Sequence, residues 1–206
     1  MAENTLHFTS AGILLGLSAG LTPGPLLTLV LTQSIKHNQT EGIKVAVSWL
    51  ITDLPIILLT VFIFHQLSEL DGFLALISFA GGAFIAYLGM ESLRVKKPDF
   101  DLQQAKTQSL KKGIIANFLN PSPYIFWTTV GTPLLFEAFQ ISLTNAVLFL
   151  FSFYGLLLGS KIAVAVLAAR SKFLMNQKSY LIVMRVLGIA LLLFSILFFY
   201  DGVKYL

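Results

Sequence analysis

Six long apolar stretches occupy most of this 206-residue chain and leave few choices for its fold. We expect them to cover these ranges: 8–33, 42–64, 73–95, 113–136, 142–169 and 180–201. Each is long enough for the roughly 20 apolar residues that a helix needs to cross a bilayer. Only 12% of the residues are charged, whereas soluble domains carry about 25%. The sequence therefore predicts an all-α integral membrane protein with six transmembrane helices, and argues against soluble, disordered and fibrous classes.

Lysine and arginine residues lie mostly in three of the segments that join these stretches, namely 33–44, 94–112 and 170–178. These segments hold eleven of them, whereas the opposite side of the membrane would hold only Lys204. Because cytoplasmic loops are rich in Lys and Arg, we expect a multi-pass protein of the cell (plasma) membrane. Its three basic loops would be cytoplasmic and both termini would lie outside.

A polar segment over 96–112 divides the chain into two halves, residues 1–95 and 113–206, which would contain three spans each. We expect this segment to be a cytoplasmic linker. Since three is an odd number, the two halves would have opposite orientations in the membrane. The pattern therefore predicts two inverted three-helix repeats.

The first span of each half carries two prolines that are separated by one residue. The motifs are Thr22-Pro23-Gly24-Pro25 and Asn120-Pro121-Ser122-Pro123. A proline inside a helix costs about 3 kcal/mol or more because it removes a hydrogen bond and clashes with the preceding turn. We therefore expect helices 1 and 4 to be broken near the bilayer midplane, although structural kinks are an alternative explanation.

Paired broken helices at matching positions of inverted halves indicate the binding site of a transporter. The free N–H groups and the positive dipole end of each second half-helix would attract an anion such as a carboxylate. Asn117 and Asn120 flank the second break, where their amides would cap backbone groups or bind a ligand, and we expect Asn117 to cap. The predicted substrate-binding residues are Thr22, Pro23, Gly24, Pro25, Asn117, Asn120, Pro121, Ser122 and Lys161.

Among the charged residues within the predicted spans are Asp53, Glu91, Lys161 and Arg185. An ionised Asp at the centre of a span costs about 2.5–3.5 kcal/mol on insertion scales, so Asp53 should face the bundle interior, either paired or protonated. A carboxyl group that switches between these states can carry a proton, and Asp53 is our candidate for proton coupling, with a structural ion pair as the alternative. Lys161 would pair with Asp53, bind a substrate carboxylate, or extend to the interface. Glu91 lies three residues before Arg94, at the spacing of a helical ion pair.

Glycines repeat every four residues at two places: Gly12, Gly16 and Gly20 in the first span, and Gly155 and Gly159 in the fifth. This spacing lets two helix backbones approach closely. We expect both sets to pack inside one bundle, with a homodimer interface as the alternative.

Several signatures of other functions are missing from the sequence. It contains no Cys, no phosphate-binding loop and no H-E-x-x-H pair, and its three His residues are scattered. We therefore expect a protein that is not an enzyme and has no catalytic residues, cofactor, metal site or nucleic-acid partner. The expected partners are a small-molecule substrate, protons and the lipid bilayer.

Four motifs resemble those of the LysE/RhtB family of amino-acid exporters. They are the run from Gly20 to Pro25, the segment from Ala46 to Asp53, the segment from Tyr87 to Arg94, and the segment from Gly113 to Trp127 with its Asn120-Pro121 pair. The chain departs from the family pattern at Leu26, Ser48 and Thr52. The resemblance implies a secondary active exporter of amino acids or related small metabolites, coupled to protons and working by alternating access. The alternatives are a passive channel and a cation (metal) transporter of the wider superfamily.

Overall fold

The structure is a computed structural model that describes residues 2–63, 70–95, 107–172 and 174–206. Every regular element in these ranges is helical, which confirms the predicted all-α class. The elements are α1 (Ala2–Leu21), α2 (Pro25–Lys36), α3 (Gln39–Ile63), α4 (Leu70–Leu93), α5 (Ser109–Phe118), α6 (Pro121–Phe126), the π-helical turn η2 (Trp127–Gly131), α7 (Thr132–Ile141), α8 (Leu143–Lys172) and α9 (Gln177–Lys204). Thus α5 begins within the predicted 96–112 linker, of which residues 96–106 lie outside the described part.

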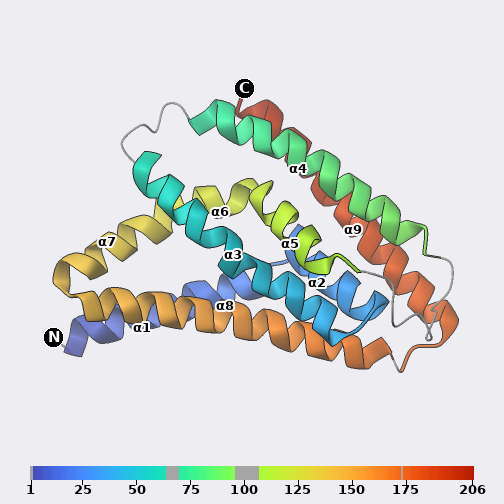
Figure 1. Cartoon of the computed structure of the whole chain (residues 1–206), viewed down its shortest axis with the longest axis horizontal. Helices are drawn as coiled ribbons and strands as arrows, with labels where there is room; N and C mark the ends of the chain where they lie inside the picture. Colours follow the sequence, from blue (N-terminus) through green and yellow to red (C-terminus); the bar gives the residue numbers. More distant parts are fainter. Residues whose placement is uncertain (1, 64–69, 96–106, 173) are drawn as a thin grey trace.

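Two pairs of helices form opposite edges of the molecule (Figure 1). In one pair α1 packs along α8, and in the other α4 packs along α9. Between these edges lie α2, α3, α5 and α6. Buried Leu26, Leu29 and Val30 of α2 pack against buried residues of α3, α4 and α9 in the largest core cluster. The second half of the first predicted span is therefore central to the bundle.

The glycines of α1 allow its close contact with α8. A Cβ atom added to Gly16 would lie only 2.2 Å from the carbonyl oxygen of Phe153, and Gly12 and Gly20 are similarly covered. Packing of these three glycines inside the bundle is confirmed. The same prediction is wrong for Gly155 and Gly159, because, apart from the adjoining backbone of α8 itself, no atom of the described chain lies within 4 Å of a Cβ built on either.

Four helices in the described part are long and apolar enough to cross a membrane, namely α3, α4, α8 and α9. The bent pair α1 and α2 would make a fifth span if the two helices are counted together. The predicted span 113–136 is not one long helix, because it is divided among α5, α6, η2 and α7. Pro121 and Pro133 explain part of this division, since neither residue can donate the backbone hydrogen bond that a continuous α-helix requires.

Glu91 does not form the helical pair with Arg94 that its spacing allows. Its carboxylate instead binds Lys36 of α2 at 2.7 Å and Lys112 of α5 at 2.7 Å. Three helices that belong to different predicted spans are thus tied together at one end of the bundle. The physical reason is proximity in space, since α2 and α5 bring two cations to a carboxylate that would otherwise be partly buried without a partner.

Candidate functional site

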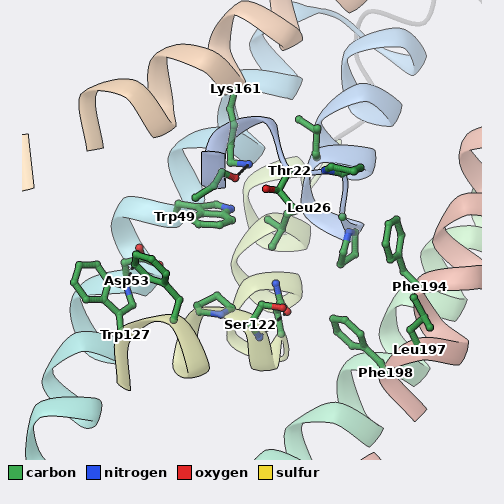
Figure 2. A pocket seen from close by; sticks show the side chains of 18 of the residues that line it. Thr22, Leu26, Trp49, Asp53, Ser122, Trp127, Lys161, Phe194, Leu197 and Phe198 are labelled. Atoms are coloured by element: carbon green, nitrogen blue, oxygen red, sulfur yellow. Dashed lines mark hydrogen bonds between the residues drawn. The ribbon is translucent and has the colours of Figure 1, made fainter. Parts of the chain in front are cut away.

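A cavity of about 320 Å³ lies where the break between α1 and α2 meets the break between α5 and α6 (Figure 2). Eight residues proposed from the sequence line it: Thr22, Pro23, Gly24, Pro25, Asp53, Asn120, Ser122 and Lys161. Asn117 and Pro121 are buried but are not among its described lining residues. The tertiary structure thus brings together most of the predicted site.

The first break leaves the N-terminal end of α2 at the cavity. α1 ends at Leu21, and α2 begins at Pro25 with its axis bent by 61°. Gly24 is extended, and its carbonyl accepts the first bond of α2, from the Thr28 N–H, at 2.9 Å. The N–H groups of Leu26 and Leu27 precede that bond, so they have no partner in the helical ladder. Both residues line the cavity, which therefore receives the positive end of the α2 dipole.

The second break is capped by its own side chains. The Oδ1 atom of Asn120 accepts a hydrogen bond from the N–H of Ser122 at 3.0 Å, and Pro121 occupies the first position of α6. The hydroxyl of Tyr124 donates to the carbonyl of Phe118 at 3.0 Å. The expectation that Asn117 caps this break is wrong, since Asn120 does so, at the position that favours Asn.

Asp53 is 1% exposed and accepts three hydrogen bonds from neutral groups. The donors are Asn117 Nδ2 to Oδ1 at 3.3 Å, Trp127 Nε1 to Oδ2 at 3.4 Å, and the Tyr154 hydroxyl to Oδ2 at 3.1 Å. They come from α5, η2 and α8, whereas Asp53 lies on α3. The carboxyl group therefore joins elements from both halves of the chain, and among the described residues no ion pair with it is present.

The π-helical turn η2 directs Trp127 toward Asp53. In a π-helical turn the backbone hydrogen bonds join residues that are five apart, whereas those of an α-helix join residues four apart, so the turn is wider. Gly131 makes room for the indole, because a Cβ atom at this position would lie 2.3 Å from the Trp127 ring. Tyr154 could not be predicted from the sequence as a partner of Asp53, because it is 101 residues away in the chain and no local pattern marks it.

Lys161 is 1% exposed and does not bind Asp53 directly. Its Nζ atom donates to the carbonyl oxygens of Ala19 at 3.3 Å and Gly20 at 3.1 Å, in the last turn of α1. The same ammonium lies 4.6 Å from the centre of the Trp49 ring. Its buried charge is therefore stabilised by the negative end of a helix and by an aromatic face.

One wall of the cavity was not predicted. Phe194, Leu197, Phe198 and Asp201 of α9 line it. The first three lie opposite Trp49 and Asp53 in the view of Figure 2. The spacing of all four, i, i+3, i+4 and i+7, places them on one helix face. The sequence shows this spacing, but in an apolar helix other faces show apolar residues at the same spacing. Only the tertiary structure therefore identifies the face of α9 that lines the cavity.

No three His, Asp or Glu side chains gather closely enough to hold a metal ion in the part of the chain that the structure describes. The chemistry that the cavity offers is binding and proton exchange: a carboxyl group, an ammonium group and free backbone N–H groups around a partly open space.

Comparison with known proteins assigns the family. A family model for the LysE type translocator matches residues 17–202. The chain belongs to the LysE type translocator family. A search of curated proteins and a search of solved structures each found no match.

The match to the translocator family covers both breaks, Asp53, Lys161 and the four α9 residues of the cavity wall. Members of this family move solutes, so this translocator is a transporter and not an enzyme. Its apolar helices and its family make it a multi-pass membrane protein. The family also implies a small-molecule substrate.

Proposed function

We propose that this translocator exports amino acids or related small metabolites from the cytoplasm by proton-coupled alternating access. The observation that carries the proposal is the cavity at the two helix breaks, because it combines Lys161, Asp53 and the N-terminus of α2. Interrupted helices that meet in this way are typical of substrate sites in secondary transporters.

The substrate carboxylate would bind at the end of the cavity next to α2. The N–H groups of Leu26 and Leu27 are available there, and Lys161 supplies a positive charge nearby. The indole Nε1 of Trp49 is buried without a hydrogen-bond partner in the described structure, and the residue lines the cavity. A buried donor without a partner is costly, and a ligand oxygen would satisfy it.

Asp53 would carry the proton. All three of its partners donate hydrogen bonds to it, and none of them is charged. A protonated carboxyl group also needs an acceptor, and Asn117 offers one, because its Oδ1 atom is buried without a partner in the described structure. Rotation of this amide would exchange its donor for its acceptor. The surroundings can therefore accommodate both protonation states.

Corresponding contacts in the two halves support two inverted repeats of three helices. α1 packs on α8 as α5 packs on α3, and α2 packs on α3 as α7 packs on α8. Lys161 of α8 binds the last turn of α1, whereas Asp53 of α3 binds Asn117 in the last turn of α5. The second span of each half, α3 or α8, thus places one ionisable group beside the break in the other half.

The basic ends of the helices support the proposed orientation. Lys172 at the end of α8 donates to the carbonyl of His37 at 3.2 Å, next to Lys36 and its partner Glu91. The segments expected to be cytoplasmic therefore lie together, and we place both termini outside the plasma membrane. Two copies of the chain would pair through the exposed glycines of α8.

Efflux from proteoliposomes tests this function. Vesicles would be loaded with a labelled amino-acid mixture, with and without an imposed proton gradient, and Asp53→Asn would be compared with wild type. Asp71→Asn is the matched control, because Asp71 is exposed in the first turn of α4. We expect gradient-driven, saturable efflux in wild type and in the control, and its loss in Asp53→Asn.

Equal leakage from wild type and Asp53→Asn would contradict the proton role. Flux that does not saturate would favour a passive channel. Movement of divalent cations in place of amino acids would favour the metal-transporter alternative, although the described residues hold no group of three metal ligands.

A further inference from the structure

The wall contributed by α9 differs in character from the rest of the cavity. Phe194, Leu197 and Phe198, here termed the α9 stripe, form a continuous apolar surface on one face of the helix. Phe198 is 5% exposed and belongs to the same core cluster as Leu26, whereas Leu197 is 53% exposed. In Figure 2 the stripe lies across the cavity from Lys161, Trp49 and Asp53.

We infer that the α9 stripe receives the side chain of the substrate, so that the substrate class is α-amino acids with bulky apolar side chains. This inference rests on the proposed function, since it assumes that the opposite wall holds the amino-acid head group. The contrast between the two sides of the cavity carries it: Lys161 and Asp53 lie on one side, whereas on the other side three apolar side chains of α9 precede the carboxylate of Asp201.

The physical preference follows from desolvation. An apolar side chain against the stripe is removed from water, which stabilises the complex in proportion to the area buried. A charged or hydroxylated side chain in the same position would lose hydration without gaining a partner. A substrate whose side chain is only a methyl group or a hydrogen atom would leave the α9 stripe exposed to water.

A basic side chain is the rival occupant, because Asp201 follows the stripe one turn later on the same face. Asp201, near the end of α9, and Asp71, in the first turn of α4, both act electrostatically on Tyr205. Burial, and then the charges of these two carboxylates, raise the pKa of Tyr205. A basic substrate would place its methylene groups along the stripe and its charged end at Asp201, so the lysine arm of the test below separates this rival from the proposal.

Counterflow into proteoliposomes tests the inference with labelled leucine, phenylalanine, alanine, lysine and glutamate, each measured separately. The variants are Leu197→Ala and Phe194→Ala. The control is Phe199→Ala, on the same helix, because Phe199 faces Phe79 and Gly82 of α4 and does not line the cavity. Leu197→Ala should disturb folding less than Phe194→Ala, because Leu197 is the more exposed of the two residues.

We expect wild type to prefer leucine and phenylalanine to alanine, lysine and glutamate by at least about tenfold in half-saturating concentration, because one methylene in an apolar pocket is worth roughly 10–200-fold. The leucine-to-alanine preference should fall by about tenfold or more in both stripe variants and stay unchanged in Phe199→Ala. A preference for alanine, lysine or glutamate, or stripe variants that keep the wild-type preference, would overturn the inference while leaving amino-acid export intact. If no amino acid is exchanged, the proposed function itself fails.

Discussion

Replacement of Gly16 by alanine should destabilise the bundle, because α1 and α8 touch at this position through their backbones. The new Cβ atom would lie 2.2 Å from the carbonyl oxygen of Phe153, whereas ordinary contacts begin at 3.4 Å. The two helices would have to separate by about 1.2 Å, the difference between these distances. A gap of roughly 0.5–1 Å already forfeits a quarter to a half of the dispersion energy of each contact.

The expected loss follows from two opposing effects. Overpacking of this kind costs about 1–3 kcal/mol. The higher helix propensity of alanine returns at most about 1 kcal/mol. The obstacle is a main-chain carbonyl, which cannot rotate away as a side chain could. We therefore expect the free energy of unfolding to fall by about 1–2 kcal/mol. For a chain of this size, that corresponds to a fall in Tm of about 2–8 °C.

The measurement is thermal unfolding of the purified protein in detergent, followed by tryptophan fluorescence. Gly72→Ala is the matched control, since it is the same substitution within a helix, here in the first turn of α4, and a Cβ built there meets no atom of the described chain within 4 Å apart from the adjoining backbone of α4 itself. Its Tm should equal that of wild type or exceed it. If Gly16→Ala and Gly72→Ala melt at the same temperature, the close contact of α1 with α8 is refuted.

Three further predictions concern the breaks, the charged end and the carboxyl group. Asn120→Ala removes the side-chain cap of α6 and should cost about 0.5–2 kcal/mol in thermal unfolding, whereas Asn120→Asp should retain most of it. Glu91→Gln removes both ion pairs of this residue and should lower Tm at low salt by more than at high salt; an equal loss at both would contradict an electrostatic cause. Tyr154→Phe removes one hydrogen bond to the carboxylate of Asp53, so the pH of half-maximal transport should rise, while Tyr124→Phe should leave that pH unchanged.

Class and family could be predicted from the sequence because both depend on local patterns. Apolar stretches of about 20 residues indicate membrane helices wherever they occur. The prolines at 23–25 and 121–123 predicted two breaks, and helices do end at Leu21 and Phe118. The exact ends also follow from local chemistry, since proline is tolerated at the first position of a helix, where Pro25 and Pro121 stand.

The partners of the charged residues were decided only by the tertiary structure. Asp53 is bound by side chains up to 101 residues away, and Lys161 binds backbone carbonyls 141 and 142 residues away. A carbonyl oxygen is present at every position, so no residue pattern could single out Ala19 and Gly20 as its acceptors. The α9 stripe was hidden for a similar reason, because α9 is apolar on all its faces.

The two sets of glycines show the same division most clearly. The sequence by itself determined that both α1 and α8 carry a face without side chains, at Gly12, Gly16 and Gly20 and at Gly155 and Gly159. Only the tertiary structure decided that the first face is covered and the second is not, because the α1 glycines contact a different face of α8 at Phe149 and Phe153. Small residues permit close packing, but the path of the whole chain decides which face a neighbour reaches.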